Sequence, residues 1–258
     1  MTGSPANQAI SPQHAQPLRV DQLRDLLRRK YPEAHRSPAA GQIPSSASPR
    51  CAVLPPNEAL TLNALEGQFT EITGGDSPEA CPGVALILHH LLELASKAGR
   101  GLVLVDGADR FDPQSYPAPL CRNLFWARCK KESGQNRGSG VQMALKVTDL
   151  FLRDGNLPLV VLDLFQIPEQ EVARVNLSIW YRLRQLTEQN GSGLCLLTAR
   201  STGPAAHRRL ALVSSFTLDA LDLPRSALLP QLRLRLERTQ SRRTAASPSL
   251  TLDTRRIA

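Results

Sequence analysis

Two short stretches of the chain decide its fold: GLVLVD at residues 101–106 and PLVVLD at residues 158–163. Each is a continuous apolar run that ends in an aspartate, which is typical of a strand buried on both faces of a sheet. The run GLCLLTA at residues 193–199 has the same character. We therefore expect these three segments to be strands of one parallel sheet.

Helical patterns lie between these strands. PGVALILHHLLELASKAG at residues 82–99 begins with a proline and ends with a glycine, as helices commonly do. Residues 141–153 and 177–190 also have helical periodicity, whereas residues 67–75 (GQFTEITGG) and 123–129 (NLFWARC) are typical of strands. Alternation of strands and helices predicts an α/β fold, with a mostly parallel sheet flanked by helices.

The pattern changes near the C-terminus. SSFTLDAL at residues 214–221 and QLRLRLERTQ at residues 231–240 alternate apolar with polar side chains, as half-exposed antiparallel strands do. SLTLDT at residues 249–254 is expected to add one more strand. The sheet is therefore predicted to end in an antiparallel extension.

The expected core has long flanks. Residues 1–17 are polar and rich in proline, and we expect them to be disordered. Residues 18–31 form an amphipathic pattern with Leu23, Leu26 and Leu27 near one helical face. These leucines pack either on the protein's own core or on a neighbouring molecule, as a partner-docking or self-association helix. Residues 32–56 are predicted to be a linker, residues 57–222 the core, and residues 223–258 basic strands and a tail.

Composition narrows the functional classes. The formal net charge of +8 favours acidic partners such as nucleic acid. Five cysteines fall singly, which argues against a zinc module or a disulfide framework. His89 and His90 are interpreted as one packed and one rim histidine, and not as a metal pair. No run approaches the roughly 20 apolar residues of a membrane helix. We expect a cytoplasmic protein without a metal.

A phosphate loop is expected where the first strand meets the first long helix, in ITGGDSPEACPGVALIL at residues 72–88. The pattern GxxxxGK[ST] wraps phosphates with backbone N–H groups, neutralises them with lysine and binds Mg²⁺ with the hydroxyl. Here Glu79, Ala80 and Cys81 take the places of the glycine, lysine and hydroxyl residue. The segment is thus a degenerate phosphate loop, comprising Gly74, Gly75, Asp76, Ser77, Pro78, Glu79, Ala80 and Cys81.

Asp163 closes the apolar strand of residues 158–163. In proteins that bind ATP through a phosphate loop, a carboxylate at the end of such a strand holds the Mg²⁺ of the nucleotide. Without a phosphate loop it has no metal to hold, so we interpret Asp163 as a hydrogen-bond acceptor at the strand end.

The stretch LVLVDGADRFDP at residues 102–113 resembles the strand and turn of the RecA recombinase core, VDAEHALDP, with Asp106, Asp112 and Pro113 in matching places. The resemblance covers roughly residues 60–240 and implies a RecA-like fold of the P-loop NTPase type. The family's water-activating glutamate falls at Ala108, and its polar pair that senses the γ-phosphate falls at Thr198 and Ala199. The resemblance thus implies a RecA-like protein with no catalytic residue and no bound cofactor.

Among RecA relatives, the chain looks most like the ImuA family of accessory proteins from bacterial mutagenesis cassettes. The shared features are the arginine-rich leading helix, the degenerate phosphate loop, the VDGADRFDP turn at residues 105–113 and the LRLRL stretch at residues 232–236. The resemblance implies an inactive scaffold in a translesion synthesis complex of the SOS response to DNA damage. Its partners there would be RecA, the Y-family polymerase-like protein ImuB and an error-prone replicative-type polymerase. It would act in the cytoplasm, at the nucleoid.

Basic residues offer candidate DNA contacts. The expected loop at residues 200–210 and the C-terminal strand and tail supply Arg200, Arg208, Arg209, Arg233, Arg235, Arg238, Arg242 and Arg243. A solvated loop and a charged edge strand that prevents aggregation explain the same residues.

Two other functions stay open. One is an atypical ATPase of the same fold that uses Asp106, Asp109 or Asp163 with Mg²⁺ and ATP. The other is a cell-division inhibitor of the SOS response.

Overall fold

The structure is a computed structural model of the whole chain, and it describes residues 29, 52–75, 83–129, 139–214, 216, 220 and 222–240. The chain divides into two units, residues 1–49 and residues 50–258. In the first unit only Arg29 is described, as an exposed helical residue. The predicted docking residues Leu23, Leu26 and Leu27 and the expected strand at 249–254 lie outside the described residues.

The second unit is built on a sheet of eight strands in the order β1-β8-β7-β2-β6-β5-β3-β4. The strands from β7 to β4 in this order pair in parallel, whereas β8 is antiparallel to both β7 and β1. Their bounds are β1 Val53–Leu54, β2 Phe69–Thr73, β3 Leu102–Asp106, β4 Leu124–Arg128, β5 Leu159–Asp163, β6 Gly193–Thr198, β7 Arg208–Leu212 and β8 Leu234–Thr239. The protein is therefore an α/β protein with a mostly parallel central sheet.

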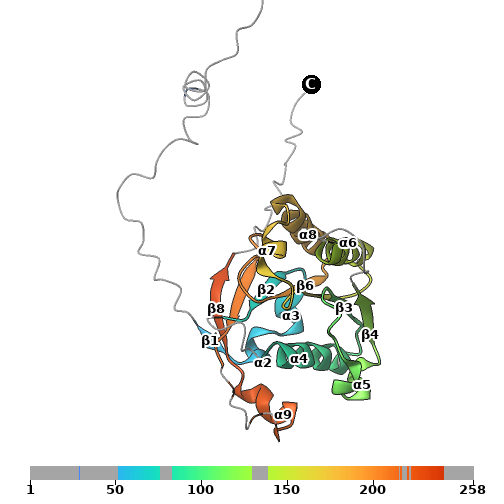
Figure 1. Cartoon of the computed structure of the whole chain (residues 1–258), viewed down its shortest axis with the longest axis vertical. Coiled ribbons are helices and arrows are strands. Elements are labelled where there is room, and N and C mark those ends of the chain that lie inside the picture. The colour runs from blue at the N-terminus through green and yellow to red at the C-terminus, as the bar shows by residue number, and fades with distance from the viewer. Residues whose placement is uncertain are drawn as a thin grey trace, which may run out of the picture. The chain divides into compact units, whose positions relative to one another are not determined.

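Helices cover both faces of this sheet (Figure 1). The long helix α4 (Gly83–Lys97) lies on one face, and α6 (Ser139–Asp154) and α8 (Leu177–Asn190) lie on the other. The shorter helices are α2 Pro56–Ala59, α3 Leu62–Leu65, α5 Ala118–Cys121, α7 Glu169–Ala173 and α9 Arg225–Leu228, with 3-10 turns η3 Pro113–Ser115 and η5 Leu229–Gln231.

Side chains of each interior strand alternate between two cores. In β3, Leu102 and Leu104 join the core under α4, whereas Val103 and Val105 join the core under α6 and α8. This alternation follows from the two-residue period of a strand, and it explains why the run reads as apolar throughout. The prediction of buried strands at residues 101–106, 158–163 and 193–199 is confirmed.

Two predictions for the C-terminal part are wrong. Ser214, Phe216 and Ala220, the described residues of the expected strand at 214–221, are not in a strand. Conversely, the expected loop at 200–210 runs into β7, which is paired in parallel with β2. Two adjacent arginines at the start of β7 made the segment look solvent-exposed in the sequence. In the structure their guanidinium groups bind partners that are distant in sequence.

The predicted linker boundary also needs correction. The expected linker at 32–56 includes β1, which pairs with β8. The basic segment from residue 223 contributes β8, antiparallel to β7, which confirms the antiparallel extension predicted at residues 231–240. β8 lies between β7 and β1 in the sheet.

Candidate functional site

The carboxyl ends of the parallel strands meet at one edge of the sheet, which is where ligands bind in proteins of this class. Thr73 ends β2 and is followed by Gly74 and Gly75, Asp106 ends β3, Asp163 ends β5 and Thr198 ends β6. Asp106 and Asp163 are paired in register on adjacent strands. The structure thus brings the predicted residues Gly74, Gly75, Asp106, Asp163 and Thr198 to a common edge.

The Asp106 carboxylate is bonded within the chain. It is 1% exposed and accepts hydrogen bonds from the backbone N–H groups of Arg110 (3.0 Å) and Phe111 (2.8 Å). The indole Nε1 of Trp126 on β4 donates a third, at 3.3 Å. These contacts fold residues 107–111 back over the end of β3, so Asp106 serves as the internal anchor of this turn.

A second acidic residue of the turn is also paired. Asp109 adopts a left-handed conformation (φ 54°), and Arg128 on β4 donates to its two carboxylate oxygens at 2.6 and 3.0 Å. The Arg128 guanidinium also lies 4.7 Å from the centre of the Trp126 ring. Asp109 therefore acts as a partner of Arg128 in this structure.

The Gly74–Gly75 turn is bonded to its own chain. The Gly74 N–H donates to the carbonyl oxygens of Thr198 and Ala199, both at 3.1 Å. Gly75 has a φ of 74°, and a Cβ placed on it would lie 2.0 Å from the carbonyl oxygen of Leu212. The end of β7 therefore closes on this turn. Residues 76–81, which hold the rest of the degenerate phosphate loop, lie outside the described residues.

The prediction that Asp163 is a hydrogen-bond acceptor is confirmed, because its Oδ1 accepts from the N–H of Phe165 at 2.9 Å. Burial raises the pKa of the Asp163 carboxyl to about 6, opposed by the Phe165 hydrogen bond and assisted by the nearby charge of Asp106. In the folded protein this carboxyl therefore loses its proton around pH 6.

A buried acid that the sequence analysis did not single out lies in the central strand. Glu71 of β2 is fully buried, and its Oε1 accepts from the N–H groups of Thr202 and Gly203, both at 2.7 Å. Thr198 donates to the same oxygen at 3.3 Å, and Arg209 donates to Oε2 at 2.7 Å. The residue at the γ-phosphate-sensing position, Thr198, therefore contacts the chain's own glutamate.

The candidate DNA-binding arginines differ in accessibility. Arg209 pairs with Glu71, and Arg208 donates to the carbonyls of Ala59 (3.1 Å) and Ala64 (3.4 Å). Burial lowers the pKa of Arg208. Both guanidinium groups thus belong to the internal packing of β7.

The other described candidates lie nearer the surface. Arg200 faces Glu169 at 3.5 Å, Arg235 contacts Glu237 at 3.3 Å, and Arg238 donates to Pro204. Arg233 is exposed and donates to the carbonyls of Pro230 and Leu232. Arg242 and Arg243 lie outside the described residues.

Both helix histidines are buried, so the prediction of a packed histidine is confirmed and that of a rim histidine is wrong. His89 and His90 of α4 are each 5% exposed; His90 contacts the Leu60 carbonyl at 3.1 Å, and the ring of His89 stacks on Tyr116. Within the described ranges, no group of three or more His, Cys, Asp or Glu side chains is placed to hold a metal ion. In the same part of the chain, no helix combines the length and apolar character needed to cross a membrane.

A cleft of about 320 Å³ opens at the carboxyl edge, and we call it the carboxyl-edge cleft. The first turns of α4, the turn after β3, the end of β5 and α9 form its walls. It is lined by Val84, Ala85, Leu88, Arg110, Phe111, Asp112, Ser115, Tyr116, Asp163, Phe165, Gln166 and Arg225. The cleft is where the described part of the edge is open to a ligand.

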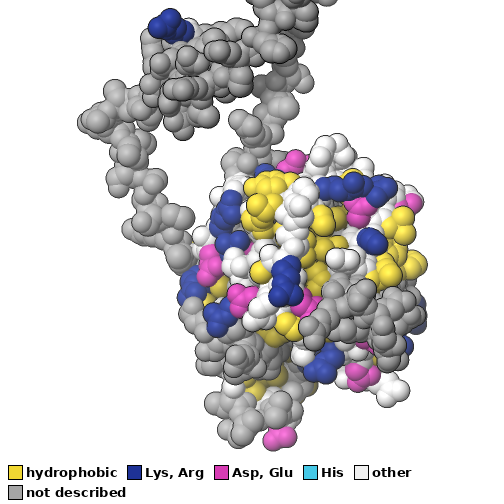
Figure 2. Space-filling model, turned by 45° about the horizontal axis from the view of Figure 1, so that its top comes forward, with side chains coloured by type: hydrophobic (Ala, Val, Ile, Leu, Met, Phe, Trp, Pro, Cys, Tyr) yellow, Lys and Arg dark blue, Asp and Glu magenta, His cyan; other side chains and the backbone are white. Residues whose placement is uncertain are grey.

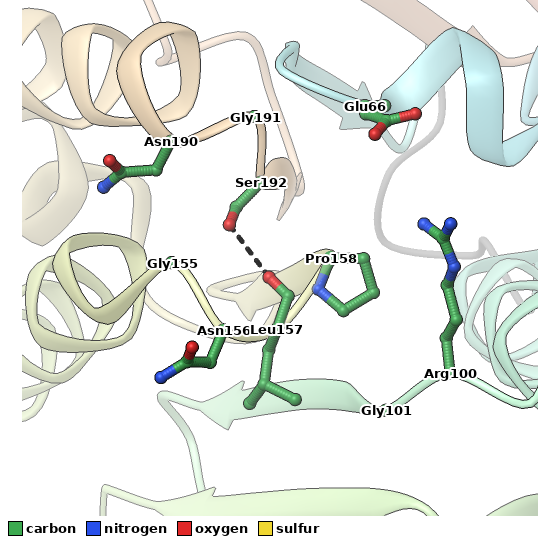
Figure 3. A pocket seen from close by; sticks show the side chains of 10 residues that line it. All are labelled: Glu66, Arg100, Gly101, Gly155, Asn156, Leu157, Pro158, Asn190, Gly191 and Ser192. Atoms are coloured by element: carbon green, nitrogen blue, oxygen red, sulfur yellow. Dashed lines mark hydrogen bonds between the residues drawn. The ribbon is translucent and has the colours of Figure 1, made fainter.

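A second hollow of about 350 Å³ lies at the opposite edge of the sheet (Figure 3). Glu66 and Arg100 lie on one side of it, and the Ser192 hydroxyl donates to the Leu157 carbonyl at 2.8 Å. The Asn190 amide donates to the Leu152 carbonyl at 2.6 Å. These polar groups largely bond to the chain itself.

No family model matches the chain, and no curated protein is significantly similar to it. The fold and the side chains at the carboxyl edge therefore define the class: a three-layer α/β protein whose described strand-end polar groups are largely bonded within the chain.

Alanine substitutions at Gly75 and Gly99 measure the cost of backbone strain separately from the cost of close packing. Gly75 and Gly99 both have positive φ (74° and 63°), but a Cβ on Gly99 would meet no atom within 4 Å. We expect Gly99→Ala to cost about 1–2 kcal/mol of unfolding free energy through its backbone conformation alone. Gly75→Ala should cost at least about 2 kcal/mol more, because the Leu212 carbonyl must move. Urea unfolding followed by tryptophan fluorescence measures both, and equal costs would show that β7 does not close on the turn.

The raised pKa of Asp163 predicts a pH-dependent stability. The folded protein holds this proton up to about pH 6, whereas the unfolded chain releases it near the ordinary pKa of 3.8. The stability that the protonated group contributes is therefore complete below about pH 4 and is lost as pH rises to about 6. We expect Asp163→Asn, which cannot ionise, to match the wild type at pH 4 and exceed it by about 1–3 kcal/mol at pH 8. Thermal melts across this range would refute the assignment if the variant were less stable at pH 8.

Proposed function

We propose that this protein is a catalytically silent RecA-like scaffold of the ImuA type. In this proposal it is an accessory subunit of a damage-induced translesion synthesis complex, which binds RecA and a Y-family polymerase-like protein and works with an error-prone replicative-type polymerase. The observation that carries the proposal is the state of the carboxyl edge, where Asp106, Asp163 and the Gly74 N–H are bonded within the chain.

The arrangement of the edge supports a RecA-like origin. An interior strand, β2, leads through two glycines toward the long helix α4, and two adjacent strands, β3 and β5, each end in aspartate. This is the geometry in which a phosphate loop and a metal-binding carboxylate face one another.

The contacts at the edge support loss of nucleotide chemistry. A phosphate would need the N–H of the glycine turn, which Thr198 and Ala199 accept, and a metal would need a free carboxylate, whereas Asp106 already accepts three hydrogen bonds. Moving any of these groups to a ligand leaves a buried partner unsatisfied, at a cost of about 1–3 kcal/mol each. Retaining the two cores while losing the site favours an interaction role.

The atypical ATPase is the second candidate, because the carboxyl-edge cleft includes Asp163 and the start of α4. In that case Mg-ATP would occupy this cleft. Calorimetry with Mg-ATP separates the two proposals, since the scaffold binds it no better than millimolar. Micromolar Mg-ATP binding that Asp163→Ala abolishes would overturn the scaffold.

Capture of purified RecA by the full chain tests the interaction role. We expect Leu26→Glu in the predicted docking helix to lower the affinity about tenfold or more, as loss of a buried interface anchor does. Leu177→Glu is the matched control, because Leu177 on α8 is 60% exposed and its replacement should leave the described core intact. The scaffold proposal fails if neither RecA nor the polymerase-like protein binds, or if both variants behave as the wild type.

A further inference from the structure

The carboxyl-edge cleft combines cationic groups with apolar walls, and this combination restricts what it can bind. The inference below rests on the proposed function, because a working nucleotide site would occupy the same edge. Exposed apolar side chains also occur elsewhere, between basic ones on the side that carries α6, α7 and α8 (Figure 2).

Two guanidinium groups line the cleft, and both are held in place. Arg225 of α9 lies over the Tyr116 ring, with its Cζ 4.4 Å from the ring centre, and donates to the Ser115 carbonyl. Arg110 donates from Nη2 to Gln166 at 2.7 Å. A guanidinium carries five N–H donors, so each retains donors for a ligand after these contacts. The two cations therefore require little ordering when an anion binds.

The walls between these cations are apolar and rigid. Val84, Leu88 and Phe165 supply apolar surface. Phe111 stacks on Tyr116 with ring centres 5.1 Å apart and meets Trp126 edge-on at 5.3 Å. These contacts fix the aromatic side of the cleft, as offset and edge-to-face pairs do. A ligand should therefore present an apolar group beside its negative charge.

The charge balance disfavours a highly charged ligand. Asp112 and Asp163 line the same cleft as Arg110 and Arg225. The side chain of Asp112 is bonded to the Gln114 N–H and the Ser115 hydroxyl, which keeps its pKa below the usual range and its charge in place. Two cations beside two acids can pair with one carboxylate but repel part of a triphosphate.

We propose that the carboxyl-edge cleft binds the C-terminal residue of a partner polypeptide, with its carboxylate on Arg110 and Arg225 and its apolar side chain against Leu88 and Phe165. One residue then supplies both the single negative charge and the apolar group that the cleft requires. A volume of about 320 Å³ is small for a nucleotide triphosphate but accommodates one or two side chains. The cleft would thus hold a partner of the scaffold by its chain end.

Fluorescence anisotropy with a labelled peptide, fluorescein-Gly-Ser-Gly-Leu-Phe, tests the proposal on the full chain. The probe is used as the free acid and as the C-terminal amide, which differ only in the carboxylate. We expect the acid to bind about tenfold tighter than the amide, as loss of a charge-assisted hydrogen bond predicts. Arg225→Gln and Arg110→Gln should each reduce acid binding toward the level of the amide.

Arg100→Gln is the matched control, because Arg100 is an exposed arginine that lines the hollow at the opposite edge. It should leave binding of the acid within twofold of the wild type. Equal affinities for acid and amide, or equal losses for Arg100→Gln and Arg225→Gln, would overturn the inference while RecA capture still supports the scaffold. Displacement of the probe by micromolar Mg-ATP would instead overturn both proposals.

Discussion

The buried carboxylate of Asp106 is the constraint on which the carboxyl edge depends. An ionised carboxylate removed from water must be hydrogen-bonded, since an unpaired one costs several kcal/mol or more. The chain meets this requirement by bending residues 107–111 back onto β3 and by placing Trp126 of β4 beside it. The bend in turn orients Phe111 toward Tyr116 and Trp126, so one wall of the carboxyl-edge cleft follows from the same acid.

A second buried acid fixes the other half of the edge. Glu71 in the centre of β2 holds the segment after β6 through Thr202 and Gly203 and orients β7 through Arg209. His207, which is buried and directly precedes β7, accepts a hydrogen bond from the Phe69 N–H and contacts Glu188 on α8. These contacts connect the start of β7 to the helix layer of α6 and α8. With β7 positioned in this way, the Leu212 carbonyl closes on Gly75. Polar contacts within the protein thus fix this half of the edge.

Much of the fold could be predicted because its interior strands have an unambiguous pattern. The run at 102–106 is apolar on both faces and ends at a buried aspartate, and the helices α4 and α8 end at glycines of positive φ. β7 was missed because Arg208 and Arg209 suggest solvent exposure. Their partners, the carbonyls of Ala59 and Ala64 and the carboxylate of Glu71, lie more than 130 residues away. No local pattern reveals such pairing. The strand predicted at 214–221 is wrong for a different reason. Alternation of apolar and polar residues favours a strand, but a strand also needs a neighbouring strand to pair with.

The site was predictable in position but only partly in chemistry. The strand-end residues Gly74, Asp106, Asp163 and Thr198 were expected at one edge, and they lie there. The carboxyl-edge cleft was not predicted, and Arg110 and Arg225 were not predicted to line one site. The two arginines share the cleft only because tertiary packing brings α9 to this edge.

Hydrogen exchange at the carboxyl edge tests the central claim, that its polar groups are committed to the chain itself. The amides of Gly74, Arg110 and Phe111 should exchange slowly, at rates that saturating Mg-ATP leaves unchanged, because their acceptors are Thr198, Ala199 and Asp106. Rapid exchange of these amides in the free protein, or a change in their rates on addition of Mg-ATP, would contradict the account.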